Sequence, residues 1–453
     1  MKMTLIEIFS EFICKKDMDF SQKALELSKN SIFDCIGAMI MGSNSKVIDK
    51  LQKNINTLGD ATILGKGKKY FLEEAAFVNG ISGHEFELDD TSSSNLGHPT
   101  VAVLPALLAI AEKEKKSGME LIKSFLIATE IECKIGRICA KELHKKGWHA
   151  STITGIIGAA AGGAYLLNLN KEETENCLGI AASMASGVRQ NFGTETKSVQ
   201  IGLVSKNAII ASYLAKNGIT ASKEALDGKE GYLYEYAGKH YDSSEFPTVN
   251  SLGHEFDICS PGFTLKRYPS CSSTHRAVDG FVDIYTQNKF SIDDIKKIKI
   301  GLGEAALREL VTPNPKTGEE AKFSIGFQIG LMMLEIPNLP EAYTEENIYN
   351  KEVQKIINRT ELYHEERSDN LPSEMGVGPA YVEVELNNGQ KFLTIKKFPK
   401  GHLTEPFSKE ELIAKFKKCT ENIISEENIE KLCQLLYNLE NEESIEKILE
   451  LTY

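Results

Sequence analysis

The stretch from Ala150 to Asn170 contains no charged residue, and it constrains the fold more than any other part of the chain. Its length would allow a helix to cross a bilayer. It is, however, rich in Gly, Ala and Thr and poor in large aliphatic side chains, and no second segment of this kind exists. Small residues let neighbouring helices approach closely. The segment therefore predicts a central helix packed by its neighbours, and we expect no membrane span.

The rest of the first half of the chain is also predicted to be helical. Apolar residues recur at helical spacing between short polar connections, and no run before about residue 290 alternates convincingly. Proline opens one of these segments, as is common in the first turn of a helix. The expected helices cover Phe20–Met41, Pro99–Lys116, Met119–Leu143, Thr152–Leu169, Lys171–Ser186 and Gly202–Asn217.

The pattern changes after a Ser/Pro/Gly-rich segment, Tyr241–Thr264, which indicates a crossing between domains. Beyond it, Ile295–Leu302 predicts a strand. Ala380–Leu386 and Lys391–Lys396, joined by Asn-Asn-Gly, predict a β-hairpin. The segments Thr274–Gln287 and Ala321–Leu334 are expected to be helices.

A second Pro/Gly-rich crossing near Pro399–Pro406 leads back to amphipathic helix. A chain of 453 residues is too long for one core. We therefore predict a mainly α fold in which residues 1–262 plus 400–453 form a helical domain and residues 263–399 form an inserted, smaller α+β domain.

Charge and cysteine usage narrow the partners and the compartment. A net charge of −12 argues against a nucleic-acid partner, which would need a basic surface. The nine cysteines are scattered and show no C-x-x-C pair, so we expect reduced thiols and a cytoplasmic location. Glu7 and Glu11 interrupt the apolar N-terminal stretch, which makes it a poor signal peptide.

One loop concentrates titratable groups. The stretch from His84 to Thr91 carries four carboxylates, and His98 follows just before Pro99. Apolar segments flank this loop on both sides, so we expect it to be held against a core. Burial of charged groups shifts their pKa values and makes proton transfer possible.

Three further segments place cationic or titratable groups at the ends of elements. They are Gly147–His149, Asn191–Lys197 and Lys266–Arg276. Several of these groups precede an expected helix, and a helix N-terminus attracts anions. Lysines and imidazoles that converge there would suit a di- or tricarboxylate and would stabilise a carbanion next to a carboxylate.

Each residue also has a simpler interpretation. His149 could cap a buried helix, Lys197 could be a solvated side chain, and His275 could form a hydrogen bond within the core. Cys271 is a weak candidate nucleophile, because a lone cysteine is more often a small apolar side chain.

A metal site built from His84, Asp89, Asp90 and His98 is conceivable. None of the recognised ligand spacings is present, however, so we predict no metal.

Taken together, the segments resemble the MmgE/PrpD family, which includes 2-methylcitrate dehydratase, cis-aconitate decarboxylase and iminodisuccinate epimerase. The likeness runs over nearly the whole chain. The stretches that carry it are His84–Thr91 with His98–Glu112, Trp148–His149 with the Gly/Ala-rich segment, Asn191–Lys197, Lys266–Arg276 and Ala321–Ser324.

The resemblance implies a helical domain formed by both chain ends, an inserted lid domain, an active site between them and, usually, a homodimer. It also implies catalysis without metal or organic cofactor. The positions that match family active-site residues are His98, His149, Lys197 and Lys266, which we predict to be catalytic. The predicted substrate-binding residues are Glu87, Asp90, Thr91, Arg267, Cys271 and His275.

Four departures from the family pattern bear on the reaction. Glu87 stands where the decarboxylases have aspartate, and one extra residue separates Thr91 from His98. Cys271 replaces a histidine of the decarboxylase branch, and Gln200 replaces a histidine seen in many members.

These features predict a cofactor-free lyase that acts on a small anionic di- or tricarboxylic acid by moving a proton next to a carboxylate. Dehydration of a 2-methylcitrate-like hydroxy acid is the first expectation, because Cys271 disfavours the decarboxylase. Epimerisation of an imino- or amino-dicarboxylate is the runner-up, followed by decarboxylation of cis-aconitate. A carboxylate-binding protein without turnover on the same fold is the alternative from another class.

Overall fold

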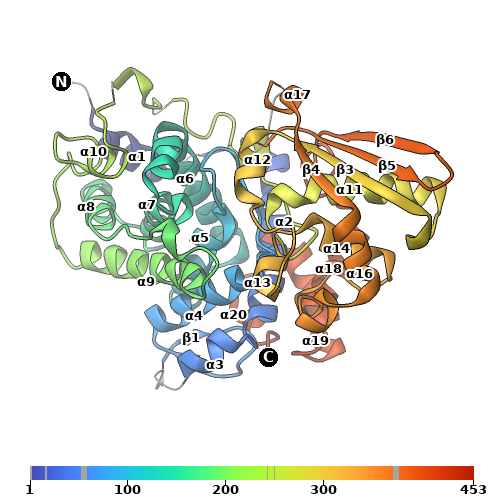
Figure 1. The fold of residues 1–453 in the computed structure, drawn as a ribbon. Coiled ribbons are helices and arrows are strands. Elements are labelled where there is room, and N and C mark those ends of the chain that lie inside the picture. The colour runs from blue at the N-terminus through green and yellow to red at the C-terminus, as the bar shows by residue number, and fades with distance from the viewer. Residues whose placement is uncertain (1–2, 16–17, 53–58, 242, 249, 371–376) are drawn as a thin grey trace. The chain divides into compact units, whose positions relative to one another are not determined.

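The computed structural model describes residues 3–15, 18–52, 59–241, 243–248, 250–370 and 377–453 (Figure 1). The chain divides into two compact units. The helical unit comprises residues 1–85, 89–263 and 408–453, and the α+β unit comprises residues 86–88 and 264–407. Helices dominate the described chain, which confirms the prediction of a mainly α fold.

The helical unit is built from the two ends of the chain. One short antiparallel ladder, β1 with β2, interrupts the helices in a region where no strand was expected. Its elements are α1 (Leu5–Ile13), α2 (Gln22–Gly42), α3 (Lys46–Gln52), β1 (Ala61–Thr62), β2 (Lys69–Tyr70), α4 (Leu72–Glu85), α5 (Pro99–Lys113), α6 (Gly118–Lys146), α7 (Ala150–Leu166), α8 (Lys171–Ala182), α9 (Thr196–Lys216), α10 (Tyr232–Ala237), α18 (Lys409–Thr420), α19 (Glu426–Tyr437) and α20 (Glu446–Leu449).

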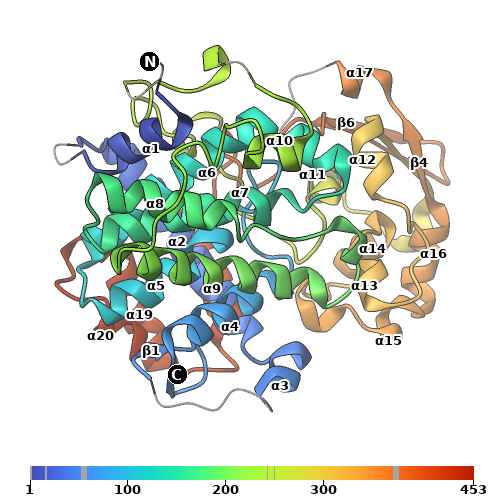
Figure 2. The same ribbon diagram turned by 90° about the vertical axis from the view of Figure 1, so that its left-hand side faces the viewer.

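Helix α7 is the uncharged segment, and it lies at the centre of this unit, packed against α5, α6, α8 and α9 (Figure 2). Its glycines permit this approach. A Cβ atom on Gly155 would lie 2.6 Å from the side chain of Ala102, and one on Gly158 would lie 2.6 Å from the carbonyl oxygen of Ala128. Among the described residues, no helix combines the length and the apolar character needed to cross a membrane.

The end of α6 explains where α7 begins. A capping box of Ser117 and Glu120 opens α6, and Gly147 closes it with a left-handed backbone (φ 85°). The chain turns at this glycine, so His149 becomes the residue that directly precedes α7.

The predicted start of α9 at Gly202 is wrong, because the helix begins at Thr196. Gly202 lies inside α9, where a Cβ atom would meet the carbonyl oxygen of Phe77 in α4 at 2.5 Å. The glycine therefore serves close helix packing and does not mark a helix end. As a result, Lys197 lies in the first turn of α9 and not in a loop before it.

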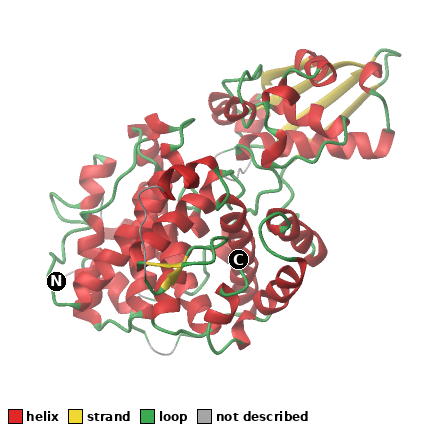
Figure 3. Ribbon diagram, turned by 90° about the horizontal axis from the view of Figure 1, so that it is seen from below, coloured by secondary structure: helices red, strands yellow, loops and turns green. Residues whose placement is uncertain are grey.

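The α+β unit contains a four-stranded sheet with the order β4-β3-β5-β6 (Figure 3). Strand β3 pairs parallel with β4 and antiparallel with β5, and β5 and β6 form the predicted hairpin. Helix α11 packs against β5 and β6. The elements are α11 (Ser272–Asn288), β3 (Ile295–Leu302), α12 (Glu304–Glu309), α13 (Gly318–Ala321), α14 (Ile325–Met333), α15 (Glu345–Ile348), α16 (Lys351–Arg359), β4 (Thr360–His364), α17 (Glu366–Asp369), β5 (Ala380–Leu386) and β6 (Lys391–Lys396).

Candidate active site

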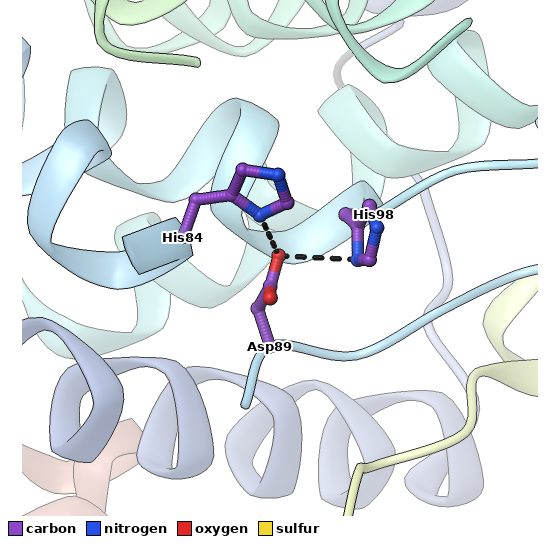
Figure 4. Close-up of side chains that lie close together, drawn as sticks. All are labelled: His84, Asp89 and His98. Carbon is purple, nitrogen blue, oxygen red and sulfur yellow. Dashed lines mark hydrogen bonds and ion pairs between the residues drawn. The ribbon is translucent and has the colours of Figure 1, made fainter. Parts of the chain in front are cut away.

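Two histidines of the helical unit share one buried carboxylate (Figure 4). Nδ1 of His84 lies 2.7 Å from Oδ2 of Asp89, and Nδ1 of His98 lies 3.2 Å from the same oxygen. Nδ1 of His98 also lies 3.0 Å from the carbonyl oxygen of Asp90. His84 comes from the end of α4, His98 directly precedes α5, and Asp89 belongs to the loop that joins these helices.

This loop is buried, as its apolar flanks predicted, and hydrogen bonds hold it in place. Asp90 and Thr91 are both almost fully buried. Asp90 accepts hydrogen bonds from the amide and the hydroxyl group of Thr100, so it caps the first turn of α5. The amide of His98 donates to Oγ of Ser151, which ties the start of α5 to the start of α7.

The backbone of the loop is strained at both ends. Glu87 and Leu96 adopt left-handed conformations with φ of 56° and 48°, which non-glycine residues rarely do. At Gly97, a Cβ atom would lie 2.5 Å from Oγ of Ser151. Strain of this kind concentrates at functional sites.

His149 and Lys197 lie beside the same histidine pair. The rings of His98 and His149 lie 4.7 and 5.9 Å from the ring of His84. Phe192 contacts both His149 and Lys197. Its ring lies 4.9 Å from the ring of His149 and 5.2 Å from Nζ of Lys197. The structure thus brings together three of the four residues predicted to be catalytic.

Three helices begin at this cluster. His98 precedes α5, His149 precedes α7, Lys197 is the second residue of α9, and the three helices contact one another. Helix N-termini carry partial positive charge. Together with the ammonium group of Lys197, they create an environment that favours an anionic ligand.

Two of the histidines are neutral at neutral pH. Burial, together with the charge of Lys197, lowers the pKa of His84 to about 4. Burial also lowers the pKa of His149 well below its usual value, and His84 and Lys197 add to this effect. Burial alone would raise the pKa of Asp89, but the interactions with His84 and His98 hold it well below the usual range. The cluster therefore combines an ionised carboxylate with imidazoles that can accept a proton.

The carboxylate and the two histidines must also be considered as metal ligands. Ligand atoms of His84, Asp89 and His98 all lie within 4.8 Å of one another. Two ligands of one tetrahedral zinc ion lie about 3.3–3.4 Å apart, given bonds of about 2.0–2.1 Å. The 2.7 Å separation between His84 and Asp89 is shorter, as expected of a hydrogen bond. The second ring nitrogen of a metal-bound histidine usually donates a hydrogen bond to a carboxylate, a carbonyl or water. In the described part of the chain, Nε2 of His84 has no hydrogen-bond partner.

Removal of divalent metals is therefore expected to leave the protein active. Dialysis against EDTA should change kcat/KM by less than about twofold, because hydrogen bonds to Asp89, and not a metal ion, hold the two histidines in place. The measurement is a rate assay before and after dialysis, with metal content determined in parallel. Loss of activity that added zinc restores would show that the cluster is a metal site.

A second group of predicted residues lies in the α+β unit. Nζ of Lys266, which is fully buried, lies 3.3 Å from Oε2 of Glu87. Burial raises the pKa of Cys271, and Oε2 of Glu309 lies 3.6 Å from its sulfur. Cys271 is therefore a protonated thiol at neutral pH, which does not suit a nucleophile.

The other two predicted residues of this unit have partners within it. Arg267 pairs with Asp279 at 3.3 Å, and its side chain is half-exposed. His275 is buried, with Nε2 3.1 Å from Oγ of Ser270. Their roles in substrate binding stay predictions, as do those of the other site residues.

Comparison with known proteins identifies the family. The MmgE/PrpD N-terminal domain matches residues 7–243, and the MmgE/PrpD C-terminal domain matches residues 268–439. The chain belongs to the MmgE/PrpD family. This confirms the resemblance found in the sequence.

Several curated relatives carry the name cis-aconitate decarboxylase. The protein of that name from Homo sapiens is 28% identical over 412 residues, covering 88% of this chain and 83% of the relative. The one from Mus musculus is 26% identical over 408 residues, covering 86% and 81%. The one from Aspergillus terreus is 25% identical over 426 residues, covering 88% and 85%. This MmgE/PrpD member is accordingly an enzyme with lyase-type activity, which disfavours the alternative of a binding protein without turnover.

Sequence reasoning missed three members of the cluster of this MmgE/PrpD protein. It weighed His84 and Asp89 only as conceivable metal ligands and gave them no catalytic role, and it treated Gln200 only as a departure from the family pattern. The signal available for the first two was their position in a charged loop flanked by apolar segments on both sides. No local signal pairs Gln200 with His149, because 51 residues separate them.

Asp90 gives the family member a pH-dependent stability. An ordinary aspartate has a pKa of 3.8, but burial raises the pKa of Asp90 to about 7, and the nearby charges of Asp89 and Asp34 add to this rise. Between these values, the folded protein holds a proton that the unfolded chain has lost. The free energy of unfolding therefore falls as the pH rises through this range.

The variant Asp90→Asn cannot ionise, so it should escape this loss. We expect its free energy of unfolding to exceed that of the wild type increasingly between about pH 4 and pH 7, by a limiting value of about 4 kcal/mol. Urea denaturation at several pH values measures the difference, and Asp49→Asn on the exposed surface of α3 is the control. A difference that is the same at every pH would contradict the assignment.

Proposed function

We propose that this protein is a cofactor-free lyase that moves a proton next to a carboxylate in a small di- or tricarboxylic acid. One observation carries the proposal: His98, His149 and Lys197 meet around the His84–Asp89 pair where three helices begin. This arrangement offers neutral bases beside fixed positive charge. That combination suits the removal of a proton from carbon.

In the proposed dehydration, Nε2 of His149 removes the proton from the carbon next to a carboxylate. The electron pair forms a carbon–carbon double bond, and the hydroxyl group on the neighbouring carbon leaves. His98 delivers the proton with which that group departs as water. Lys197 and the helix N-termini stabilise the negative charge that develops on the carboxylate. The family resemblance adds Lys266 as a second ligand for a substrate carboxylate.

Three reactions share this charge distribution. Dehydration of a 2-methylcitrate-like hydroxy acid remains the first candidate, because the family resemblance implies a histidine of the decarboxylase branch where this chain has Cys271. Decarboxylation of cis-aconitate is the second, and the names of the curated relatives favour it. Epimerisation of an imino- or amino-dicarboxylate is the third.

A panel of substrates separates these reactions. The protein is mixed with 2-methylcitrate, with cis-aconitate and with an amino- or imino-dicarboxylate in deuterium oxide. New absorbance of an unsaturated acid from 2-methylcitrate supports dehydration, and release of CO₂ from cis-aconitate supports decarboxylation. Deuterium entering the α-position without loss of water or CO₂ supports epimerisation. Absence of all three reactions at high enzyme concentration would contradict the proposal.

We further propose that the protein is a homodimer, as the family resemblance implies. A cytoplasmic location is consistent with its nine cysteines, all of which have free thiols. Light scattering on the purified protein tests the dimer, and a molar mass equal to that of one chain would contradict it.

A further inference from the structure

Gln200 of α9 forms a hydrogen bond with His149 that has a defined direction. Its Oε1 lies 2.8 Å from Nδ1 of His149, and its Nε2 donates to the carbonyl oxygen of Val188 at 3.1 Å. A carbonyl oxygen can only accept. Because Val188 presents a carbonyl, the amide group of Gln200 must turn its NH₂ toward Val188 and its oxygen toward His149.

This orientation sets the tautomer of His149. Since Oε1 of Gln200 can only accept, Nδ1 of His149 must carry the proton, and Nε2 keeps its lone pair. We infer that Gln200 is a positioning residue that holds His149 in the one neutral form whose Nε2 can act as a base. The inference rests on the proposed role of His149 as the base.

The short segment of residues 187–189, which contains Val188, also fixes the backbone of His149. The amide of His149 donates to the carbonyl oxygen of Gly187 at 3.0 Å, and the amide of Arg189 donates to the carbonyl oxygen of Gly147 at 2.8 Å. Trp148 and Val188 form an isolated β-bridge. The segment that orients the amide of Gln200 therefore also holds the main chain of His149. As a result, the ring of His149 and the amide of Gln200 keep a fixed position relative to each other.

The amide of Gln200 orients His149 without adding a charge beside it. The titratable groups that act on His149 are His84, Lys197 and His98, and each of them opposes a positive charge on its ring. A carboxylate at position 200 would accept the same hydrogen bond but would favour the charged imidazolium. A neutral acceptor therefore keeps His149 available as a base to lower pH than a carboxylate would.

Two variants separate these effects. Gln200→Met has a similar length but accepts no hydrogen bond of this strength, so His149 should populate both neutral tautomers, and kcat should fall by roughly 100-fold. Gln200→Glu should keep the proton on Nδ1 and move the acidic limb of the pH–rate profile upward by about one pH unit or more. Asn207→Ala is the control, because the amide of Asn207, on the same helix, binds a backbone carbonyl and no histidine.

The tautomer is read directly by nitrogen NMR of the full-length protein labelled with ¹⁵N-histidine, with His149→Asn identifying the His149 signals. The inference predicts a protonated Nδ1 and an unprotonated Nε2 in the wild type, in Gln200→Glu above the pKa of His149 and in the control, and mixed signals in Gln200→Met. Unchanged His149 signals in Gln200→Met would overturn it. This readout needs no substrate, so a protein that fails the substrate panel but loses the tautomer in Gln200→Met would contradict the proposed function and not the role of Gln200.

Discussion

Replacing His149 by asparagine is expected to lower kcat by about 10³-fold, because a general base contributes between about 10² and 10⁴ to the rate. His149 is buried, its pKa is held well below the usual value, and its Nδ1 is engaged by Gln200. Its Nε2 is thus the group available to remove a proton at neutral pH. Steady-state kinetics on whichever acid the panel identifies measures the effect.

The control for this variant is His240→Asn, since His240 lies on the exposed surface of the same unit and stacks on Tyr234. The control should retain the wild-type rate, and both variants should give the circular dichroism spectrum of the wild type. A His149→Asn protein that keeps more than about a tenth of the wild-type kcat would exclude His149 as the base.

Replacing Asp89 by asparagine is expected to have an effect of similar size. One carboxylate oxygen of Asp89 receives hydrogen bonds from both His84 and His98. Asparagine has no negative charge to favour these two rings as donors, and one of its two polar groups is a donor itself. In a serine protease, the corresponding change from aspartate to asparagine lowers kcat by about 10⁴. We expect about 10³-fold here, because His149 keeps its own partner.

Asp89→Asn should lower kcat far more than it raises KM, since Asp89 is fully buried and acts through the histidines. The matched control is Asp49→Asn, which makes the same chemical change at an exposed position. If Asp89→Asn loses substrate affinity but keeps kcat, the carboxylate has a role in binding and not in orienting the histidines.

Local sequence signals were enough to predict many of the longer elements. The hairpin of β5 and β6 begins and ends where its alternation and its Asn-Asn-Gly turn predicted. The proline at the start of α5 marked its first residue. These signals work because a turn or a helix start depends on residues close together in the chain.

Predictions that depended on tertiary packing were less successful. Gly202 was taken for the boundary of α9, whereas it is the point where that helix touches α4. Strand β4 was missed, because Thr360–His364 is a half-exposed edge strand whose pairing with β3 is not local.

The candidate site was predicted only in part, because some of its contacts also depend on tertiary packing. His98, His149 and Lys197 could be found because they match active-site positions of the family that the sequence resembles, and because each precedes an expected helix in the sequence. The hydrogen bond that selects the tautomer of His149 joins residues 51 positions apart, so it becomes visible only when α7 and α9 lie side by side.

The most direct test of the account is a crystal structure of the protein with an unreactive dicarboxylate, such as a saturated analogue of the acid that the panel identifies. The account predicts a carboxylate group about 3 Å from Nζ of Lys197, with the adjacent carbon facing Nε2 of His149. A dicarboxylate that binds with micromolar affinity but touches neither Lys197 nor His149 would contradict it.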